Sequence, residues 1–504
     1  MACNIWCRLA VLALCSITLP STASTIETAA SEKRPNVLLI MVDDLKPALG
    51  SYGDPNAISP NIDRLAARGV RFENAYANQA VCMASRYNLM LGSRSTSTGL
   101  YNFGTDFREV YPNAITLPQH FKNNGYISQS MGKVYHIGHG NENDEASWTL
   151  THHKEKVIEY LLPESTHRQL TREEAFFGNV DTGVRNKQLP RGAAWESPDV
   201  LDEAYADGRV ASIVIDRLRK TAGKPQEKFF MAVGFARPHM PFSAPKKYWD
   251  LYDPKQFELA KFQKHPKNAP KISRKRRGEI TQYFPIPEDK EDYDEALQRK
   301  LIHGYYASMS YMDAQVGRVL NALDHYGLSD DTIVVLWGDH GFHLGDHGIW
   351  TKHTNFEQAT HIPLIIAAPG MQHGVSSGQL AETVDIYPTL VELAGLPQPQ
   401  TPQPIDGQSL VPVLKNPKAR VRDHAYHAFP HAGVLGLAIR TEQYRMVRWQ
   451  KSPDDDAIYE LYDLLNDPLE TENIAGQEPK VVEELEAILE SHPKAVGLKT
   501  HRGL

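Results

Sequence analysis

Continuous apolar runs alternate with amphipathic segments along most of the chain. The apolar runs are typical of strands buried on both faces of a sheet, and they are Asn36–Val42, Phe229–Phe235, Thr332–Gly338 and Pro363–Gly370. Apolar residues recur at helical spacing in Pro60–Gly69, Asp202–Lys220 and Gln298–His325. This alternation predicts an α/β fold with a large, mainly parallel sheet flanked by helices.

The pattern changes after a segment rich in proline and glutamine, Leu396–Gly407, which is typical of a linker. Beyond it, AIRTEQYRMVRWQ and AIYELYDL alternate as strands of an antiparallel sheet do, and Pro479–His492 has the period of a closing helix. We therefore predict a large domain over residues 33–396 and a smaller C-terminal α+β subdomain over residues 408–504.

The first residues have the layout of a secretory signal peptide rather than of a folded element. An apolar run, Leu9–Pro20, follows a segment with one positive charge and precedes small residues. The sequence thus predicts a signal peptide over residues 1–23 and export to the periplasm or the medium, with an uncleaved anchor as the alternative. Three of the four cysteines lie in this segment, so the mature chain keeps Cys82 alone.

Composition excludes several classes of protein. The 504 residues are 41% hydrophobic, which is too apolar for a disordered chain, and the mean hydropathy of −0.43 argues against a polytopic membrane protein. With 54 Lys and Arg against 61 Asp and Glu, the net charge of −7 gives no support for nucleic-acid binding. The basic run over residues 261–277 is interpreted either as a solvated loop or as a patch that steers a polyanionic substrate.

Acidic residues directly follow two of the predicted strands. Asp43 and Asp44 come after the first apolar run, and Asp339 and His340 come after the third. Ligands of open parallel sheets bind at the carboxyl ends of the strands, where the three carboxylates would repel one another without a cation. Carboxylate oxygens favour Ca²⁺ or Mg²⁺, although one imidazole leaves other divalent metals open, and Asp also caps helices.

A second candidate group surrounds the lone cysteine. In VCMASR, Cys82 opens a predicted helix, where unpaired backbone N–H groups favour an anion, and Arg86 follows one turn later on the same face. The forked guanidinium suits a tetrahedral oxyanion. The alternative is a buried structural cysteine.

Lysines and histidines follow other strand-like segments. They are Lys133 and His136 in GKVYH, His239 in ARPHMPF, and Lys352 and His353 in GIWTKHTNF. Their position after strands predicts that they share the edge that holds the acids, although an isolated histidine in a loop is more often a surface residue.

Several of these motifs, in this order, resemble the type I sulfatases. The similarity covers residues 33–490, and VDDLKPALGSYGD, QAVCMASR, LYNFGTDFRE, GKVYHIG, SYMDAQVGR and WTKHTNFEQATHIPLI are most similar to the iduronate-type branch and its bacterial relatives. The resemblance implies the alkaline-phosphatase-like sulfatase fold and a hydrolase of sulfate monoesters.

The resemblance also implies a modified residue and a metal ion. In this family a formylglycine-generating enzyme oxidises the cysteine at the position of Cys82 during export. One Ca²⁺ would be bound by Asp43, Asp44, Asp339 and His340, with an oxygen on modified residue 82. Position 84 is Ala, which the family's motif permits beside Pro.

The family's mechanism carries over to the remaining residues. A hydroxyl of the hydrated aldehyde attacks sulfur, while Arg86, Lys133 and Lys352 neutralise the charge of the sulfate. His239, assisted by Lys352, would protonate the departing sugar oxygen. His136 would take the proton of the second hydroxyl, which expels sulfate and regenerates the aldehyde.

The resemblance suggests a sulfated saccharide as substrate, a 2-sulfated uronic acid or a related sugar. His343, His347 and His353, with Arg108 and the basic run, are candidates for a carboxylate subsite or plain surface residues. Two other functions stay open: a phosphonate or phosphate monoester hydrolase on the same scaffold, and an inactive glycan-binding relic whose Cys82 is never oxidised. Neither a nucleic-acid partner nor a membrane span after signal cleavage is expected.

Overall fold

A computed structural model describes residues 1, 34–136, 138, 143–183, 188–224, 226–275, 278–289, 292–452 and 454–498. Pro35–Leu504 forms one compact unit. The predicted signal peptide lies outside the described residues, apart from residue 1. Within the described part of the chain, no helix is both long and apolar enough to cross a membrane.

The described residues form a central sheet of seven strands. In spatial order the strands are β3 (Ile127–Gly132), β5 (Phe229–Phe235), β1 (Asn36–Val42), β7 (Thr332–Gly338), β8 (His361–Ala367), β2 (Val70–Tyr76) and β9 (Val375–Glu382). The first four are mutually parallel, as are β2 and β9, whereas β8 is antiparallel to both of its neighbours. The predicted mainly parallel sheet is therefore confirmed, with one reversed strand.

Burial explains which strands could be predicted from an apolar run in the sequence. Every residue of β1, β5 and β7 is buried, so both faces of these strands are apolar and the runs read as continuous. By contrast, β2 alternates between buried and partly buried residues and β9 contains exposed positions, so neither has such a run.

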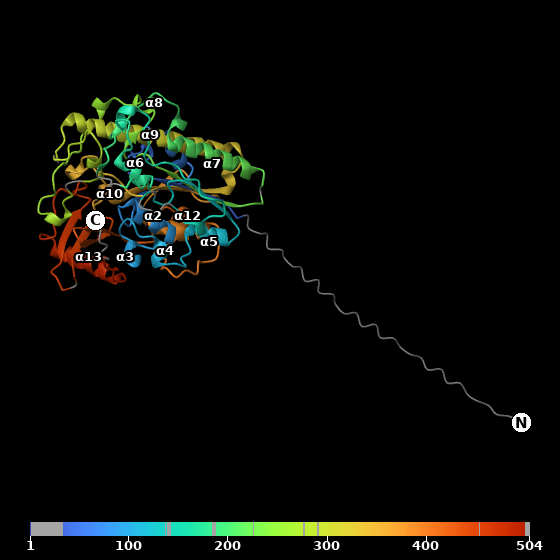
Figure 1. Ribbon diagram of the computed structural model, residues 1–504. Helices are drawn as coiled ribbons and strands as arrows, with labels where there is room; N and C mark the ends of the chain where they lie inside the picture. The colour runs from blue at the N-terminus through green and yellow to red at the C-terminus, as the bar shows by residue number, and fades with distance from the viewer. Residues whose placement is uncertain are drawn as a thin grey trace. The chain divides into compact units, whose positions relative to one another are not determined.

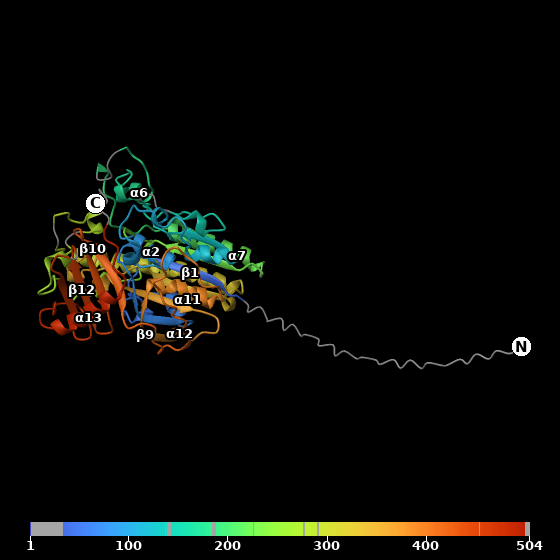
Figure 2. The same cartoon turned by 90° about the horizontal axis from the view of Figure 1, so that it is seen from below.

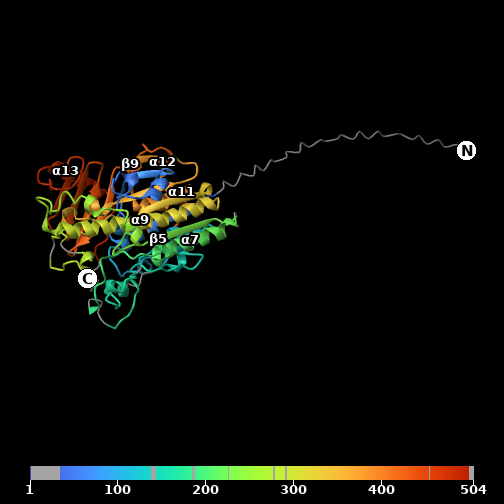
Figure 3. The same cartoon turned by 90° about the horizontal axis from the view of Figure 1, so that it is seen from above.

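Helices cover both faces of the sheet (Figures 1 and 3). Successive side chains of a strand point to opposite faces, so Leu38 and Ile40 enter one hydrophobic core while Val37 and Leu39 enter the other. The first core is covered by α1 (Pro60–Ala66), α7 (Ala206–Ala222) and α9 (Glu295–His325). The second is covered by α2 (Cys82–Leu91), α5 (Leu117–Asn123), α11 (Ile386–Leu393) and α12 (Val411–Lys415).

The C-terminal part forms a separate antiparallel sheet, as predicted (Figure 2). Its strands are β10 (Ala425–His431), β11 (Val434–Arg440), β12 (Tyr444–Gln450) and β13 (Ile458–Asp463), and α13 (Pro479–Ser491) packs against them. The segment Leu396–Gly407 contains no helix or strand, and its Asp406 accepts a hydrogen bond from the backbone N–H of Arg94 at 2.7 Å. This hydrogen bond ties the segment to the large domain at Arg94.

Short elements complete the fold between these parts. They are η1 (Gly50–Tyr52), α3 (Ser95–Thr98), α4 (Phe107–Val110), η2 (Glu145–Ser147), η3 (Pro163–Ser165), α6 (Arg172–Phe177), β4 (Trp195–Glu196), η5 (Asp202–Ala204), β6 (Phe242–Ser243), α8 (Lys246–Trp249), η6 (Pro254–Gln256), η7 (Lys271–Ser273), η8 (Glu279–Gln282), η9 (Ser329–Asp331), η10 (Asp346–Gly348), α10 (Glu357–Thr360) and η11 (Thr383–Asp385). The predicted helix Asp202–Lys220 is thus divided into η5 and α7.

Candidate active site

Asp43 and Asp44 meet Asp339 and His340 at the carboxyl edge of the central sheet. β1 and β7 are parallel neighbours, and Val42 lies opposite Gly338, so the residues that follow each strand are adjacent. The backbone N–H of Asp44 donates to Asp339 Oδ1 at 3.0 Å. The side chains of Asp43, Asp44 and Asp339 are fully buried. The fold therefore concentrates negative charge where water does not solvate it.

His340 directs its Nε2 toward this cluster. Its Nδ1 lies 3.0 Å from the carbonyl oxygen of Gly341 and, because a carbonyl only accepts, Nδ1 is the donor of this hydrogen bond. Nε2 lies 3.2 Å from Cys82 Sγ and 3.6 Å from both Asp44 Oδ1 and Asp339 Oδ1. Several electron-pair donors thus converge on one point.

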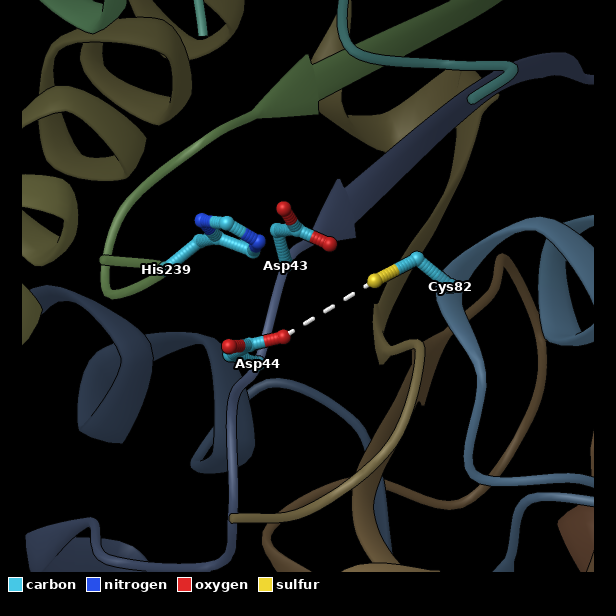
Figure 4. A group of neighbouring side chains, drawn as sticks. All are labelled: Asp43, Asp44, Cys82 and His239. Carbon is cyan, nitrogen blue, oxygen red and sulfur yellow. Dashed lines mark hydrogen bonds between the residues drawn. The ribbon is translucent and has the colours of Figure 1, made fainter. Parts of the chain in front are cut away.

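This donor set fits a metal ion. Ligand atoms of Asp43, Cys82, Asp339 and His340 lie within 4.8 Å of one another, as do those of a second grouping in which Asp44 and His239 replace the last two. Figure 4 shows the second grouping, with both carboxylates directed toward the thiol. Buried carboxylates need compensating positive charge, and a ring nitrogen held by a backbone carbonyl is typical of a histidine ligand.

Cys82 enters the site from the first position of α2, whose residues are all buried. Its Sγ lies 4.0 Å from Asp44 Oδ1 (Figure 4). Burial raises the pKa of the Cys82 thiol well above its ordinary value, an effect that outweighs the nearby charge of Lys352. The unmodified side chain is therefore a neutral thiol and a poor nucleophile.

Arg86, one helical turn after Cys82, holds the acids in place. Its Nε donates to Asp339 Oδ2 at 3.0 Å and its Nη2 to Asp43 Oδ1 at 3.2 Å, while Nη1 donates to the carbonyl of Lys133. Lys133 Nζ in turn pairs with Asp43 Oδ2. This fully buried guanidinium therefore ties the ends of β1, β7 and β3 together.

The two carboxyl groups that share Arg86 differ in acidity. Burial raises the pKa of Asp339 to about 6, and the neighbouring charge of Asp43 adds to the rise. Burial acts on Asp43 in the same direction, but the positive charges of Lys133, His239 and Arg86 hold its pKa well below the ordinary value. Asp43 is accordingly the carboxylate that these cations keep ionised.

His239 and Lys352 are joined by a residue that the sequence did not indicate, Glu279 in η8. His239 Nε2 lies 2.9 Å from Glu279 Oε1, and Nδ1 lies 2.6 Å from the carbonyl oxygen of Met240. Both ring nitrogens thus face acceptors. Lys352 Nζ donates to Asp44 Oδ2 at 3.0 Å and to Glu279 Oε2.

Phe177, at the end of α6, forms an aromatic wall that the sequence also did not indicate. Its ring centroid lies 5.9 Å from that of His136, 5.5 Å from that of His239 and 5.3 Å from Lys133 Nζ. His136 is buried. One apolar ring thus lies beside all three polar residues.

Comparison with known proteins identifies the family. The family model described as Sulfatase matches residues 35–396. The chain belongs to the sulfatase family. It is therefore a sulfuric ester hydrolase, and the resemblance noted in its motifs is confirmed. A second model, N-sulphoglucosamine sulphohydrolase, C-terminal, matches residues 345–495.

Relatives match this sulfatase over most of their length. It is 34% identical to iduronate 2-sulfatase from Homo sapiens, over 87% of this chain and 90% of the relative. It is 31% identical to a sulfatase from Formosa agariphila, over 88% of this chain and 83% of the relative.

Solved structures confirm the fold. A protein solved with its substrate D-glucosamine-2-N,6-O-disulfate has a TM-score of 0.70 at 23% identity, covering 91% of this chain and 97% of its own. A phosphonate monoester hydrolase of Agrobacterium radiobacter has the same TM-score and identity, covering 91% of this chain and 95% of its own. The predicted alkaline-phosphatase-like sulfatase fold is confirmed.

Three candidates for a carboxylate subsite have other partners in this sulfatase. Arg108 donates to Asp144 at 2.8 Å. His343 Nε2 lies 2.9 Å from the hydroxyl of Thr354, and His347 Nε2 lies 3.0 Å from the carbonyl of Leu469. Contacts within the protein engage each of these three side chains, and their place in a shared subsite stays a prediction.

Proposed function

We propose that this sulfatase hydrolyses sulfate monoesters of a sulfated sugar, with Cys82 converted to formylglycine. The observation that supports this best is the position of Cys82: the side chain lies at the point where buried acids, His340 and two lysines converge. A neutral buried thiol has no evident use there. A formylglycine at this position would supply a hydrated aldehyde, whose hydroxyl is the nucleophile.

The proposed metal is one Ca²⁺. Asp43, Asp44, Asp339 and His340 would hold it together with an oxygen of modified residue 82. Carboxylate oxygens predominate in this set, which favours a hard cation. When bound, the ion supplies positive charge that offsets the charge of the sulfate group.

Residues of the chain supply the remaining positive charge. Lys133 and Lys352 each pair with a buried carboxylate, so their ammonium groups are fixed before substrate arrives. Arg86 is fixed by two carboxylates. Donors that are already oriented cost no reorganisation as charge develops, and they are most effective in a site that excludes water.

His239 is proposed as the general acid. Its Nε2 holds a proton that Glu279 Oε1 keeps in position at 2.9 Å. As the S–O bond breaks, this proton passes to the departing sugar oxygen, and the sugar leaves as a neutral alcohol. His136, whose ring also lies near that of Phe177, is proposed as the base that accepts a proton in the step that releases sulfate.

We propose a 2-sulfated uronic acid as the sugar. The support is the similarity to the iduronate 2-sulfatases of Homo sapiens and Mus musculus, at 34% and 33% identity. We also propose export, with removal of residues 1–23 and maturation by a formylglycine-generating enzyme. The support is the layout of charge, apolar run and small residues in that segment.

The mass of the tryptic peptide Phe72–Arg86 from the exported protein tests the modification. An aldehyde in place of the thiol is the expected result. The same preparation is assayed in parallel on sulfate and phosphonate esters, with Cys82→Ala as the inactive control. Turnover of the phosphonate ester alone would assign the chain to the alternative hydrolase. An intact thiol with no turnover would indicate a glycan-binding relic and would overturn the mechanism.

A further inference from the structure

While Cys82 is unmodified, the site presents a sulfur and an imidazole nitrogen next to its carboxylates. Cys82 Sγ lies 3.2 Å from His340 Nε2 and 4.0 Å from Asp44 Oδ1, and these last two atoms lie 3.6 Å apart. All three residues are buried. Three donor atoms from three different segments of the chain therefore form the corners of a small triangle inside the site.

Contacts on the far side of two of these groups orient the triangle. Lys352 donates to Asp44 Oδ2 at 3.0 Å, so Oδ1 is the oxygen of this carboxylate that faces the thiol (Figure 4). His340 Nδ1 donates to the carbonyl oxygen of Gly341 at 3.0 Å, so in the neutral ring Nε2 carries the lone pair. A histidine that a backbone carbonyl orients in this way is typical of a metal ligand.

The cations of the site contact other oxygens. Arg86 Nη2 and Lys133 Nζ pair with the two oxygens of Asp43. Arg86 Nε donates to Asp339 Oδ2 at 3.0 Å. The contacts of Arg86, Lys133 and Lys352 thus leave the three donor atoms of the triangle to face one another, and a small divalent ion between them would bind these atoms without displacing an ion pair.

The triangle has the dimensions of a tetrahedral zinc site. With Zn–S, Zn–N and Zn–O bonds of about 2.3, 2.05 and 2.1 Å, tetrahedral angles place sulfur about 3.6 Å from each of the other two ligands and nitrogen about 3.4 Å from oxygen. The three distances between Cys82, His340 and Asp44 differ from these values by about 0.4 Å or less. Asp339 Oδ1, which also lies 3.6 Å from His340 Nε2, is in place to be the fourth ligand.

The chemistry of the donors decides which metal fits this form of the site. Ca²⁺ takes about six to eight oxygen ligands, and neither thiolate sulfur nor imidazole nitrogen is a ligand that it prefers. Zn²⁺ takes four ligands and binds thiolate, imidazole and carboxylate together. Replacement of the sulfur by the oxygen of a hydrated aldehyde shifts the set toward the hard ligands of Ca²⁺. The chemical state of residue 82 therefore sets the metal preference.

We propose that the folded chain with an unmodified Cys82 binds one Zn²⁺ through Cys82, His340, Asp44 and Asp339. On binding, an S–Zn bond replaces the S–H bond, the thiol hydrogen passes to the solvent as a proton, and no electron is transferred. This zinc site belongs to the thiol form, whereas the proposed function requires the modified form, so the two are tested separately.

Cobalt substitution tests the site in full-length protein whose Cys82 is a thiol, as verified by the mass of the peptide Phe72–Arg86. Co²⁺ accepts the ligands of Zn²⁺, and its bond to a thiolate gives a charge-transfer band in the near ultraviolet. We expect this band with one Co²⁺ per chain, its loss when Zn²⁺ displaces Co²⁺, and no displacement by millimolar Ca²⁺. Cys82→Ser should lose the band and raise the Kd for Zn²⁺ about a hundredfold or more, because the thiolate ligand is lost.

Two histidine variants separate this site from zinc bound elsewhere. His340→Gln should raise the Kd for Zn²⁺ as Cys82→Ser does, with the Tm of both metal-free variants close to that of the parent. His492→Gln is the matched control, because His492 Nε2 lies 2.7 Å from His424 Nε2 and this pair offers Zn²⁺ another position; its band and Kd should equal those of the parent. A band that survives in Cys82→Ser would assign the sulfur to the cysteines of residues 1–23. That result, or equal Kd values for the parent and Cys82→Ser, would overturn the proposal.

Discussion

Neutralising Glu279 is expected to slow the cleavage of sugar esters far more than that of activated esters. The Glu279→Gln change removes the negative charge that holds His239 and Lys352 in position but preserves the shape of the side chain. The alkoxide of a sugar is a poor leaving group and needs the proton of His239. A nitrophenolate is a good leaving group and departs without this proton. Glu279 thus acts as a positioning residue whose effect depends on the leaving group.

The magnitude follows from the geometry of the pair. At 2.9 Å, the ionic contact between Glu279 and His239 has a gross Coulomb energy of about 6 kcal/mol at an effective dielectric constant of 20. Glutamine still accepts a hydrogen bond, so the net loss is that of one charge-assisted bond, about 2 kcal/mol. The side chain of His239 is only 1% exposed and that of Glu279 is 15% exposed, so solvent screens little of the interaction between them. The expected fall in kcat is roughly thirtyfold.

The assay compares kcat for a sulfated sugar and for 4-nitrophenyl sulfate in the same preparations. Glu288→Gln is the matched control, because this glutamate is 64% exposed and pairs with Arg191 outside the catalytic residues. We expect the sugar ester to lose about thirtyfold in kcat with little change in KM, and the aryl ester to lose much less. An equal loss on both esters, or none on the sugar, would refute the assigned role of Glu279.

Three further perturbations test the electrostatics and the packing of the site. Burial and the charge of Glu279 raise the pKa of Glu173 to about 8 from an ordinary 4.5. The folded state therefore binds more protons between these values and loses stability as pH rises through them. Glu173→Gln should match the parent in Tm near pH 4 and exceed it at pH 9, by up to about 5 kcal/mol in unfolding free energy. Parallel Tm–pH curves for the two proteins would contradict this. Chelation by EGTA should lower both the activity and the Tm of the parent, and Ca²⁺ should restore them better than Mg²⁺. The Asp339→Asn change should abolish the response of Tm to EGTA. A parent protein whose Tm does not change with EGTA would argue against the calcium site. A Cβ at position 234 would lie 1.9 Å from the carbonyl oxygen of Lys133, so Gly234→Ala should lower the free energy of unfolding by about 3 kcal/mol or more and impair activity. Gly223→Ala is the control, because its Cβ would have its nearest contact at 4.0 Å. Urea unfolding should show little change for this control.

Much of the fold and several site residues were predictable from local sequence. Strands β1, β5 and β7 are buried on both faces, so their apolar runs mark their bounds directly. The residues that follow β1 and β7 then lie at one sheet edge, because the carboxyl ends of parallel strands share that edge. Cys82 and Arg86 are one helical turn apart, a relation that depends on chain spacing alone.

The sequence was less informative about strands and side chains whose role depends on distant partners. The direction of β8 is set by its pairing with β7 and β2, and an apolar run has the same appearance in either direction. The partners of the candidate subsite histidines show the same limit: His343 contacts Thr354 and His347 contacts the carbonyl of Leu469, neither of which the spacing of the motif indicates.

Sequence by itself determined the mainly parallel character of the sheet, the family and the residues that lie within a turn or a strand end of a recognisable motif. Tertiary structure alone decided that Glu279 joins His239 to Lys352 and that the ring of Phe177 lies beside both His239 and His136. The reason is physical. Periodicity and spacing indicate which face or edge a residue occupies. An ion pair such as that of His239 and Glu279 joins residues that are 40 positions apart. It forms only when packing has brought their elements together and excluded the water that would otherwise solvate each charge.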